Sequence, residues 1–278
     1  MIIFFFSWEL VGLCSYLLIS FWKVNQHSNL SSIKAVLYNK LGDIFLLLAI
    51  GCSFDLLYFA YFDFMFLLLG VFNLVLEYYN NPINILCCCL IIAAFTKSTK
   101  IPFSGWMTDA MAAPTPVSAL LHAATMVTAG IFLLFRFWFI IISNTICSIG
   151  GFTSLFGSIV AVFQSHMKKI IAYSTTSQLG YLCWSCGLSN YFGATFHLFG
   201  HAFFKSLLFL TAGVVLHSNI NEVYVYKLGG FTTVLVTSYT FIFVCSISLI
   251  GLPSISGYYS KEYILSSSYY VWFDLFLL

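Results

Sequence analysis

The sequence predicts an all-α protein, a polytopic transmembrane helical bundle, from its composition and the length of its apolar stretches. Hydrophobic residues make up 61% of the 278 residues, charged residues only 7%, and the mean hydropathy is +0.97. A soluble domain carries roughly a quarter charged residues, so this chain could not cover a water-facing surface. Several apolar stretches also reach the about 18–20 residues that cross the roughly 30 Å hydrocarbon core of a bilayer.

The same composition excludes two other classes of protein. Transmembrane barrels need segments of alternating polarity about ten residues long, and the sequence contains none. The 11 Lys and Arg residues are balanced by 9 Asp and Glu, and they form no basic patch of the kind that binds nucleic acid. We therefore expect membrane lipids around the chain and no nucleic-acid partner.

The apolar stretches predict eight membrane spans. In order along the chain, they cover residues 2–22, 41–58, 83–112, 117–141, 150–165, 170–188, 192–217 and 231–268. The third and the eighth are too long for straight crossings, and each contains a proline–glycine interruption. Residues 59–79 are apolar but hold Asp63 and Glu77, so we read them as an interfacial helix, with a ninth span as the alternative.

The basic residues between the predicted spans indicate an orientation. Loops after the first, third, fifth and seventh spans share one side of the membrane, whereas the opposite loops hold no Lys or Arg. The positive-inside rule places the basic loops in the matrix or cytoplasm. Arg136, near the end of the fourth span, is the exception. The lysines assigned to these loops are Lys23, Lys34, Lys40, Lys168, Lys169 and Lys227.

The two long spans share an interruption of the same type. Residues 101–105 read IPFSG, and residues 252–257 read LPSISG. Paired broken helices in matching positions indicate an ion site, because irregular backbone at that depth needs protein or water to satisfy its polar groups. A proline kink without function is the alternative. An ionisable residue beside each interruption favours the ion site.

Charged residues within the predicted spans are candidates for this site. Glu9 lies in the first span, Asp43 opens the second, Lys97 precedes the first interruption, and Lys261 with Glu262 follows the second. A charge at mid-membrane costs about 2.5–3.5 kcal/mol, and such residues usually mark ion pathways or pair with one another. A static Glu9–Lys97 pair would explain two of them, but the number of charges in one bundle favours a pathway.

A second group of candidates is spaced at helical intervals. His197, His201 and Lys205 are four residues apart, so they share one helix face and extend over about 12 Å. Histidine titrates near neutral pH, so such a row can take up and release protons. His122 adds another titratable group, although a lone histidine is as often a satisfied core residue.

Neither a metal site nor a redox centre is expected on this chain. Cys183 and Cys186 form a C-x-x-C, but they lie in an apolar helix without a second ligand pair. His197 and His201 have the spacing of metal ligands but no third ligand of a standard type. The sequence also lacks a dinucleotide fingerprint and a P-loop. If the chain belongs to an oxidoreductase, its cofactors therefore lie on other subunits.

Taken in order, the motifs resemble those of one family. They are residues 8–12 (WELVG), 42–43 (GD), 112–127 (AAPTPVSALLHAATMV), 172–181 (AYSTTSQLGY), 201–205 (HAFFK) and 257–262 (GYYSKE). From about residue 7 to about residue 265, this set resembles the antiporter-like membrane subunits of mitochondrial NADH:ubiquinone oxidoreductase, respiratory complex I. His122, where the sister subunits 2 and 4 usually have lysine, favours the subunit 5 branch of that family.

The resemblance implies a fold of two inverted five-helix repeats within a single membrane domain, each repeat with one broken helix. Residues 1–145 would form the first repeat, and residues 146–278 the second, incomplete one. Departures from the family pattern include Lys40 in place of arginine, Thr108 in place of proline, and alanines at 112–113 in place of an acidic residue. Family members also carry helices before and after this segment, so we expect separate chains to supply the missing helices or to cover the exposed faces.

The resemblance also implies a proton path through the chain. Glu9 and Lys97 would form the charge pair of the uptake half-channel with Asp43 as a support, His122 would be the connection, and Lys261 would lie in the exit half-channel. His197, His201 and Lys205 would extend the central hydrophilic axis. The complete implied set is Glu9, Asp43, Lys97, His122, His197, His201, Lys205 and Lys261.

The function implied by the resemblance is that of a proton-translocating subunit, which couples NADH oxidation and ubiquinone reduction on other subunits to proton pumping. NADH, FMN, iron–sulfur clusters and ubiquinone would bind other subunits of the complex. We expect a multi-pass protein of the mitochondrial inner membrane, next to antiporter-like subunit 4 and other membrane subunits. Two alternatives are a subunit of a multi-chain sodium/proton antiporter, which shares these motifs, and a structural membrane subunit that does not pump.

Overall fold

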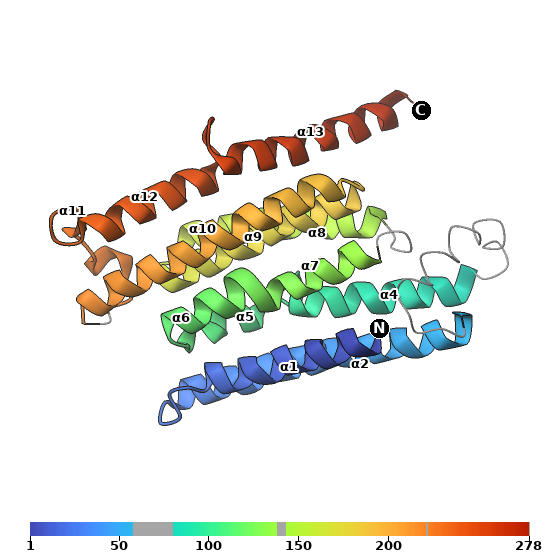
Figure 1. Cartoon of the computed structure of the whole chain (residues 1–278), viewed down its shortest axis with the longest axis horizontal. Helices are drawn as coiled ribbons and strands as arrows, with labels where there is room; N and C mark the ends of the chain where they lie inside the picture. Colours follow the sequence, from blue (N-terminus) through green and yellow to red (C-terminus); the bar gives the residue numbers. More distant parts are fainter. Residues whose placement is uncertain (58–79, 138–142, 221, 278) are drawn as a thin grey trace.

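The computed structural model describes residues 1–57, 80–137, 143–220 and 222–277. Within these ranges the regular elements are helices, together with one isolated bridge between His166 and Tyr224, so the all-α fold class is confirmed. The long helices lie side by side, roughly parallel or antiparallel, and the chain progresses from α1 and α2 at one face of the bundle to α12 and α13 at the other (Figure 1). The predicted interfacial helix at 59–79 lies outside the described residues.

Among the described residues, the first part of the bundle contains three long helices and two short ones. α1 spans Ile2–Ile19, α2 spans Gln26–Leu57 and α4 spans Asn80–Lys97; the short α5 (Gly105–Asp109) and the 3-10 helix η2 (Ala110–Ala112) follow the interruption after α4. α2 packs against both α1 and α4.

α2 begins at Gln26, well before the predicted start at residue 41, so the prediction that Lys34 and Lys40 lie in a loop is wrong. The polar stretch is helical because two of its lysines pair with carboxylates of other helices and several of its small polar side chains pack inside the bundle. Lys34 pairs with Asp109, and Lys40 pairs with Glu9 at 2.8 Å between Nζ and Oε2. Three serines and one asparagine of the same stretch are buried: Ser28, Ser31, Ser32 and Asn39.

A composite helix crosses the middle of the bundle. It consists of α6 (Thr115–Ser118), the π-helix η3 (Ala119–Thr125) and α7 (Met126–Arg136), and Pro114 and Pro116 lie at its start. Proline suits a helix start because its missing N–H is not needed there. π-Helical turns occur frequently at functional sites, and His122 lies within this one.

The second part contains α8 (Ser143–Phe163), α9 (Met167–Gly187) and α10 (Tyr191–Ser218), followed by η4 (Val225–Lys227), α11 (Phe231–Val234), α12 (Val236–Ile250) and α13 (Ser256–Leu277). Both predicted interruptions are confirmed. The third predicted span is broken around Thr99, with φ 54°, between α4 and α5. The eighth predicted span is divided around Gly251 and Ser254, with φ 85° and 78°.

Five helical segments of the described residues are long and apolar enough to cross a membrane. They are Ile2–Ile19, Gln26–Phe54, Thr115–Arg136, Asn144–Phe163 and Tyr191–Ser218. Asn84–Lys97 and Val236–Ile250 are apolar but shorter, and both adjoin an interruption. The predicted breaks therefore divide crossings into shorter helices, as expected of broken helices at membrane depth.

α8 and α9 approach one another closely through glycines on both helices. A Cβ atom on Gly150 would lie 2.5 Å from the backbone nitrogen of Trp184, and one on Gly180 would lie 2.6 Å from that of Ser154. These distances are too short for any side chain. Small residues at a helix interface allow such close backbone contact, which drives association of helices in membranes.

Replacing Gly180 with alanine should therefore destabilise the protein by about 1–3 kcal/mol, because the added methyl group has no room between the two backbones. Thermal unfolding of the purified, detergent-solubilised protein measures this loss. Gly151→Ala is the matched control, since a Cβ atom there meets nothing within 4 Å. An equal effect of the two substitutions would contradict the close α8–α9 contact.

Candidate functional site

Trp8 joins a buried lysine to a buried aspartate near the interruption of α4. Lys97, with 0% exposure, donates a hydrogen bond to the Trp8 carbonyl oxygen at 2.6 Å, and its Nζ lies 4.4 Å from the centroid of the Trp8 ring. The Trp8 indole Nε1–H donates to Asp43 Oδ1 at 2.8 Å. One residue of α1 thereby positions a cation of α4, through its backbone carbonyl, and an anion of α2, through its indole.

Glu9 contacts Lys40 rather than Lys97. Lys40 Nζ lies 3.0 and 2.8 Å from the two Glu9 carboxylate oxygens, and 3.7 Å from Asp43 Oδ2. Glu9 and Asp43 interact with Lys97 through their electric fields, but among the described residues neither carboxylate touches it. The cluster therefore contains two cations and two anions, with Lys97 separated from direct ion pairing.

His197 is held by two neighbouring helices. Its ring Nδ1 lies 2.9 Å from Ser260 Oγ on α13, and its Nε2 lies 3.1 Å from Gln178 Oε1 on α9. The ring is fully buried. Ser260 directly precedes Lys261, so this contact connects the first part of α10 to the helix that follows the second interruption.

His201 and Lys205 continue the row along α10. The His201 ring centroid lies 6.3 Å from that of His197 and 5.5 Å from that of Phe204. Lys205, with 0% exposure, donates to Ser174 Oγ at 2.5 Å and points to the Ile171 carbonyl oxygen at 3.5 Å. The predicted row on one helix face is thus buried, and it lies against α9.

Lys261 uses a backbone acceptor that the second interruption makes available. In a continuous helix the Leu249 carbonyl would accept from residue 253, but Pro253 has no N–H. Lys261 Nζ donates to that carbonyl instead, and it lies 5.9 Å from the centroid of the Tyr181 ring. α12 and α13 meet closely here, since a Cβ atom on Gly257 would lie 1.8 Å from the Ser248 carbonyl oxygen.

The structure thus places the predicted residues in two groups. The first surrounds Trp8 and contains Glu9, Asp43 and Lys97; the second lies where α9, α10 and α13 meet, and the charge of Lys261 acts on all three members of the α10 row. His122 lies between α6 and α7 in sequence, within η3, and its side chain is outside the described part of the structure.

Two lysines of the site were missed by the sequence analysis as candidates. Lys40 was assigned to a loop, although its spacing of three residues from Asp43 on one helix face could have indicated the pair. Lys100 lies within the first interruption and has 0% exposure. A lysine in an apolar span beside a break is the same signal that selected Lys97.

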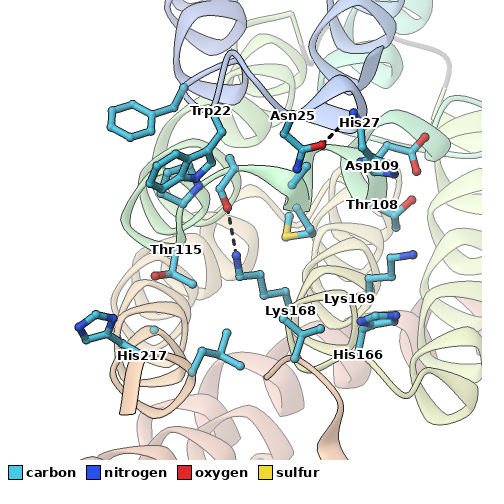
Figure 2. A pocket seen from close by; sticks show the side chains of 18 of the residues that line it. Trp22, Asn25, His27, Thr108, Asp109, Thr115, His166, Lys168, Lys169 and His217 are labelled. Carbon is cyan, nitrogen blue, oxygen red and sulfur yellow. Dashed lines mark hydrogen bonds between the residues drawn. The ribbon is translucent and has the colours of Figure 1, made fainter. Parts of the chain in front are cut away.

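A basic cavity of about 1240 Å³ opens at the end of the bundle near the α1–α2 connection. Lys168 points into it from the start of α9 and donates to the Ala113 carbonyl oxygen at 3.1 Å (Figure 2). Lys168 precedes the predicted span 170–188, and burial lowers the pKa of its ammonium group below the ordinary value for lysine. The basic residues that line the cavity are Lys23, His27, His166, Lys168, Lys169 and His217.

Comparison with known proteins identifies the family. The family described as "NADH:quinone oxidoreductase/Mrp antiporter, TM" matches residues 1–278. NADH-ubiquinone oxidoreductase chain 5 of Metridium senile is 44% identical over 270 residues, which cover 95% of this chain and 44% of the relative. The same-named chain of Talaromyces marneffei is 45% identical over 270 residues, covering 95% and 40%.

A solved structure, that of the Mrp complex from Dietzia sp. DQ12-45-1b, has the same fold. It superposes with a TM-score of 0.84 at 30% sequence identity, over 95% of this chain and 29% of that chain. The chain described here therefore spans less than half the length of the relatives with which it was compared.

Replacing Trp8 with phenylalanine should remove the indole donor to Asp43 while leaving an aromatic ring beside Lys97. Because Asp43 is 4% exposed, the loss of its partner should destabilise the protein by about 1–3 kcal/mol. Thermal unfolding with Trp22→Phe as the control tests this, since Trp22 is 56% exposed and surface substitutions usually change stability by less than about 0.5 kcal/mol. A Trp8→Phe variant as stable as the control would contradict the proposed positioning of Asp43.

Proposed function

The chain belongs to the NADH:quinone oxidoreductase/Mrp antiporter transmembrane family, and from this premise we propose that it is a proton-translocating membrane subunit of respiratory complex I. NADH oxidation and ubiquinone reduction would take place on other subunits, and this chain would carry protons through the membrane. The proposal includes residues 1–145 and 146–278 as two antiporter-like repeats of a single membrane domain.

The observation that carries the proposal is how the buried lysines are held. Lys97, Lys205 and Lys261 each donate to a backbone carbonyl or a hydroxyl oxygen. Within the described ranges, none of the three contacts a carboxylate. A lysine used only to fasten helices would be expected in a close ion pair, because an unpaired buried charge is expensive. An ammonium held by neutral acceptors can lose its proton without leaving a buried carboxylate unpaired.

The first group supplies a means of changing the charge state of Lys97. Two opposite charges in an apolar interior favour each other's ionised form, and they lose that support when they separate. A shift of Glu9 between Lys40 and Lys97 would therefore load or release a proton at Lys97. Asp43, fixed by Trp8, would keep a constant negative charge beside both lysines.

The second group would pass the proton on. His197 has a polar partner on each ring nitrogen, so it can accept a proton on one side and release one from the other. Lys205 lies one turn beyond His201, and Lys261 contacts the interruption between α12 and α13. We assign the central axis to the α10 row, the exit to Lys261 and the connection between the groups to His122.

The relatives support a proposal for the location and the partners of this chain. Chains named NADH-ubiquinone oxidoreductase chain 5 are 44% and 45% identical to this chain, so we propose the mitochondrial inner membrane, beside antiporter-like subunit 4. Large apolar side chains of α1 face outward, among them Ile3 and Leu10, with exposures of 84% and 62%. These would contact lipid or the chains that supply the remaining helices.

A sodium/proton antiporter subunit is the second candidate, because the Mrp complex structure superposes on 95% of this chain. The two candidates differ in their associated proteins. Purification of the assembly followed by mass spectrometry should find flavin and iron–sulfur proteins with a complex I subunit. Their absence, with other antiporter subunits present, would favour the second candidate.

Replacing Lys205 with methionine should stop proton transfer along α10 while keeping a side chain of similar length. A positioned proton-transfer group contributes about 10²–10⁴-fold to a rate, so transfer through this subunit should slow at least about 100-fold. The number of protons moved per NADH oxidised by the reconstituted complex measures the effect. Lys227→Met is the matched control, because Lys227 is exposed and pairs only with Glu222 among the described residues. An unchanged ratio in Lys205→Met would support the non-pumping alternative.

A further inference from the structure

Two buried basic side chains lack partners in the described part of the chain. Lys100 is 0% exposed, and no side-chain or backbone atom there accepts a hydrogen bond from its Nζ. His201 is also 0% exposed, and neither of its ring nitrogens has a partner among the described residues. Buried polar groups in native proteins are bonded to protein or to water, so each of these groups requires an explanation.

The interruption after α4 directs its two lysines toward different neighbours. α4 ends at Lys97, which donates to Trp8 of α1. The backbone then passes through Thr99, with φ 54°, and the Lys100 N–H bonds back to the Phe95 carbonyl at 3.0 Å. The charge of Lys100 acts on residues of α9 and on His201 of α10 instead.

Contacts of the interruption confirm that this segment lies against α9. The Met107 sulfur is 3.7 Å from Thr99 Oγ1 and 3.6 Å from Thr175 Oγ1, so it bridges the broken segment and α9. Thr175 directly follows Ser174, the acceptor for Lys205. The break thus connects the surroundings of Lys97 with those of the α10 row.

The side chains around Lys100 do not supply the hydrogen-bond acceptors that its ammonium group needs. The titratable side chains whose charges act on it are those of Cys183 and Cys186, the C-x-x-C pair of α9. A thiol is a weak acceptor, and an ammonium has three donors. The charged groups that act on His201 are Lys205, His197, Lys261 and Lys100, all of them basic, and the nearest ring, that of Phe204, is apolar. Water is the remaining group that can accept from Lys100 and also bond to the imidazole of His201.

We propose that Lys100 and His201 share a buried water site and that Lys100 is a further proton carrier of this chain, which connects the Lys97 group to the α10 row. The inference rests on the proposed function and adds a residue to its path. In the transfer step, the Lys100 ammonium gives one proton to a water molecule, which gives one to a His201 ring nitrogen. The Lys100 amine then recovers a proton from the Lys97 side, so one proton moves and no other bond changes.

Three substitutions in the intact complex test the role of Lys100. Lys100→Met removes the charge and the donors, Lys100→Gln keeps a polar group without an exchangeable charge, and Lys100→Arg keeps the charge. Protons moved per NADH oxidised are measured in reconstituted complex, and subunit content by mass spectrometry. Lys205→Met is measured in parallel as the test of the proposed function, and Lys227→Met as the neutral control.

The inference predicts that both neutral variants assemble and that their proton ratio falls to the level of Lys205→Met. Lys100→Arg should not recover the ratio, because a guanidinium keeps its proton in a protein and cannot act as a carrier. Full recovery in Lys100→Arg would show that only a fixed charge is needed here and would overturn the carrier role. A ratio in the neutral variants equal to that of Lys227→Met, while Lys205→Met is impaired, would overturn the role of Lys100 alone. Failure of both neutral variants to assemble would show that Lys100 is structural, which also overturns it. If the proton ratio of Lys205→Met equals that of Lys227→Met, the proposed function is contradicted, and the inference that rests on it is contradicted as well.

Discussion

The requirement to hold ammonium groups inside an apolar bundle governs the arrangement of this protein. A buried cation without partners is too expensive to persist, and a close carboxylate would fix its proton. For Lys97, Lys205 and Lys261, the chain avoids both problems by supplying a neutral oxygen acceptor at the depth where the lysine lies. The Trp8 carbonyl accepts a hydrogen bond from Lys97. The Leu249 carbonyl accepts one from Lys261, because Pro253, which would be its helical donor, has no N–H. The helix interruptions are therefore a source of hydrogen-bond acceptors as well as bends.

The close helix contacts are part of the same arrangement. α12 and α13 approach so closely at Gly257 that Lys261 reaches back across the break to Leu249. α8 and α9 meet through glycines, and α9 then presents Gln178 and Ser174 to the basic row of α10. Tight packing on one face of α9 thus positions the polar groups on its other face.

The sequence was sufficient to predict the features that depend on local chemistry. Proline and glycine mark both interruptions, and the four-residue spacing places His197 with Lys205 on one face. The sequence was not sufficient to predict features that depend on contacts between segments distant along the chain. The start of α2 was predicted too late because its polar residues resemble a loop until their partners are known. Glu9 was expected to pair with Lys97, and only the folded arrangement shows that it contacts Lys40.

The proposed function requires that the buried basic groups form one hydrated path across the bundle. A high-resolution electron cryo-microscopy map of the intact assembly, in which ordered water is visible, tests this most directly. We expect water density that continues from Lys97 through the α10 row to Lys261. Dry apolar packing around these side chains, with no water between the two groups, would contradict it and leave a membrane scaffold.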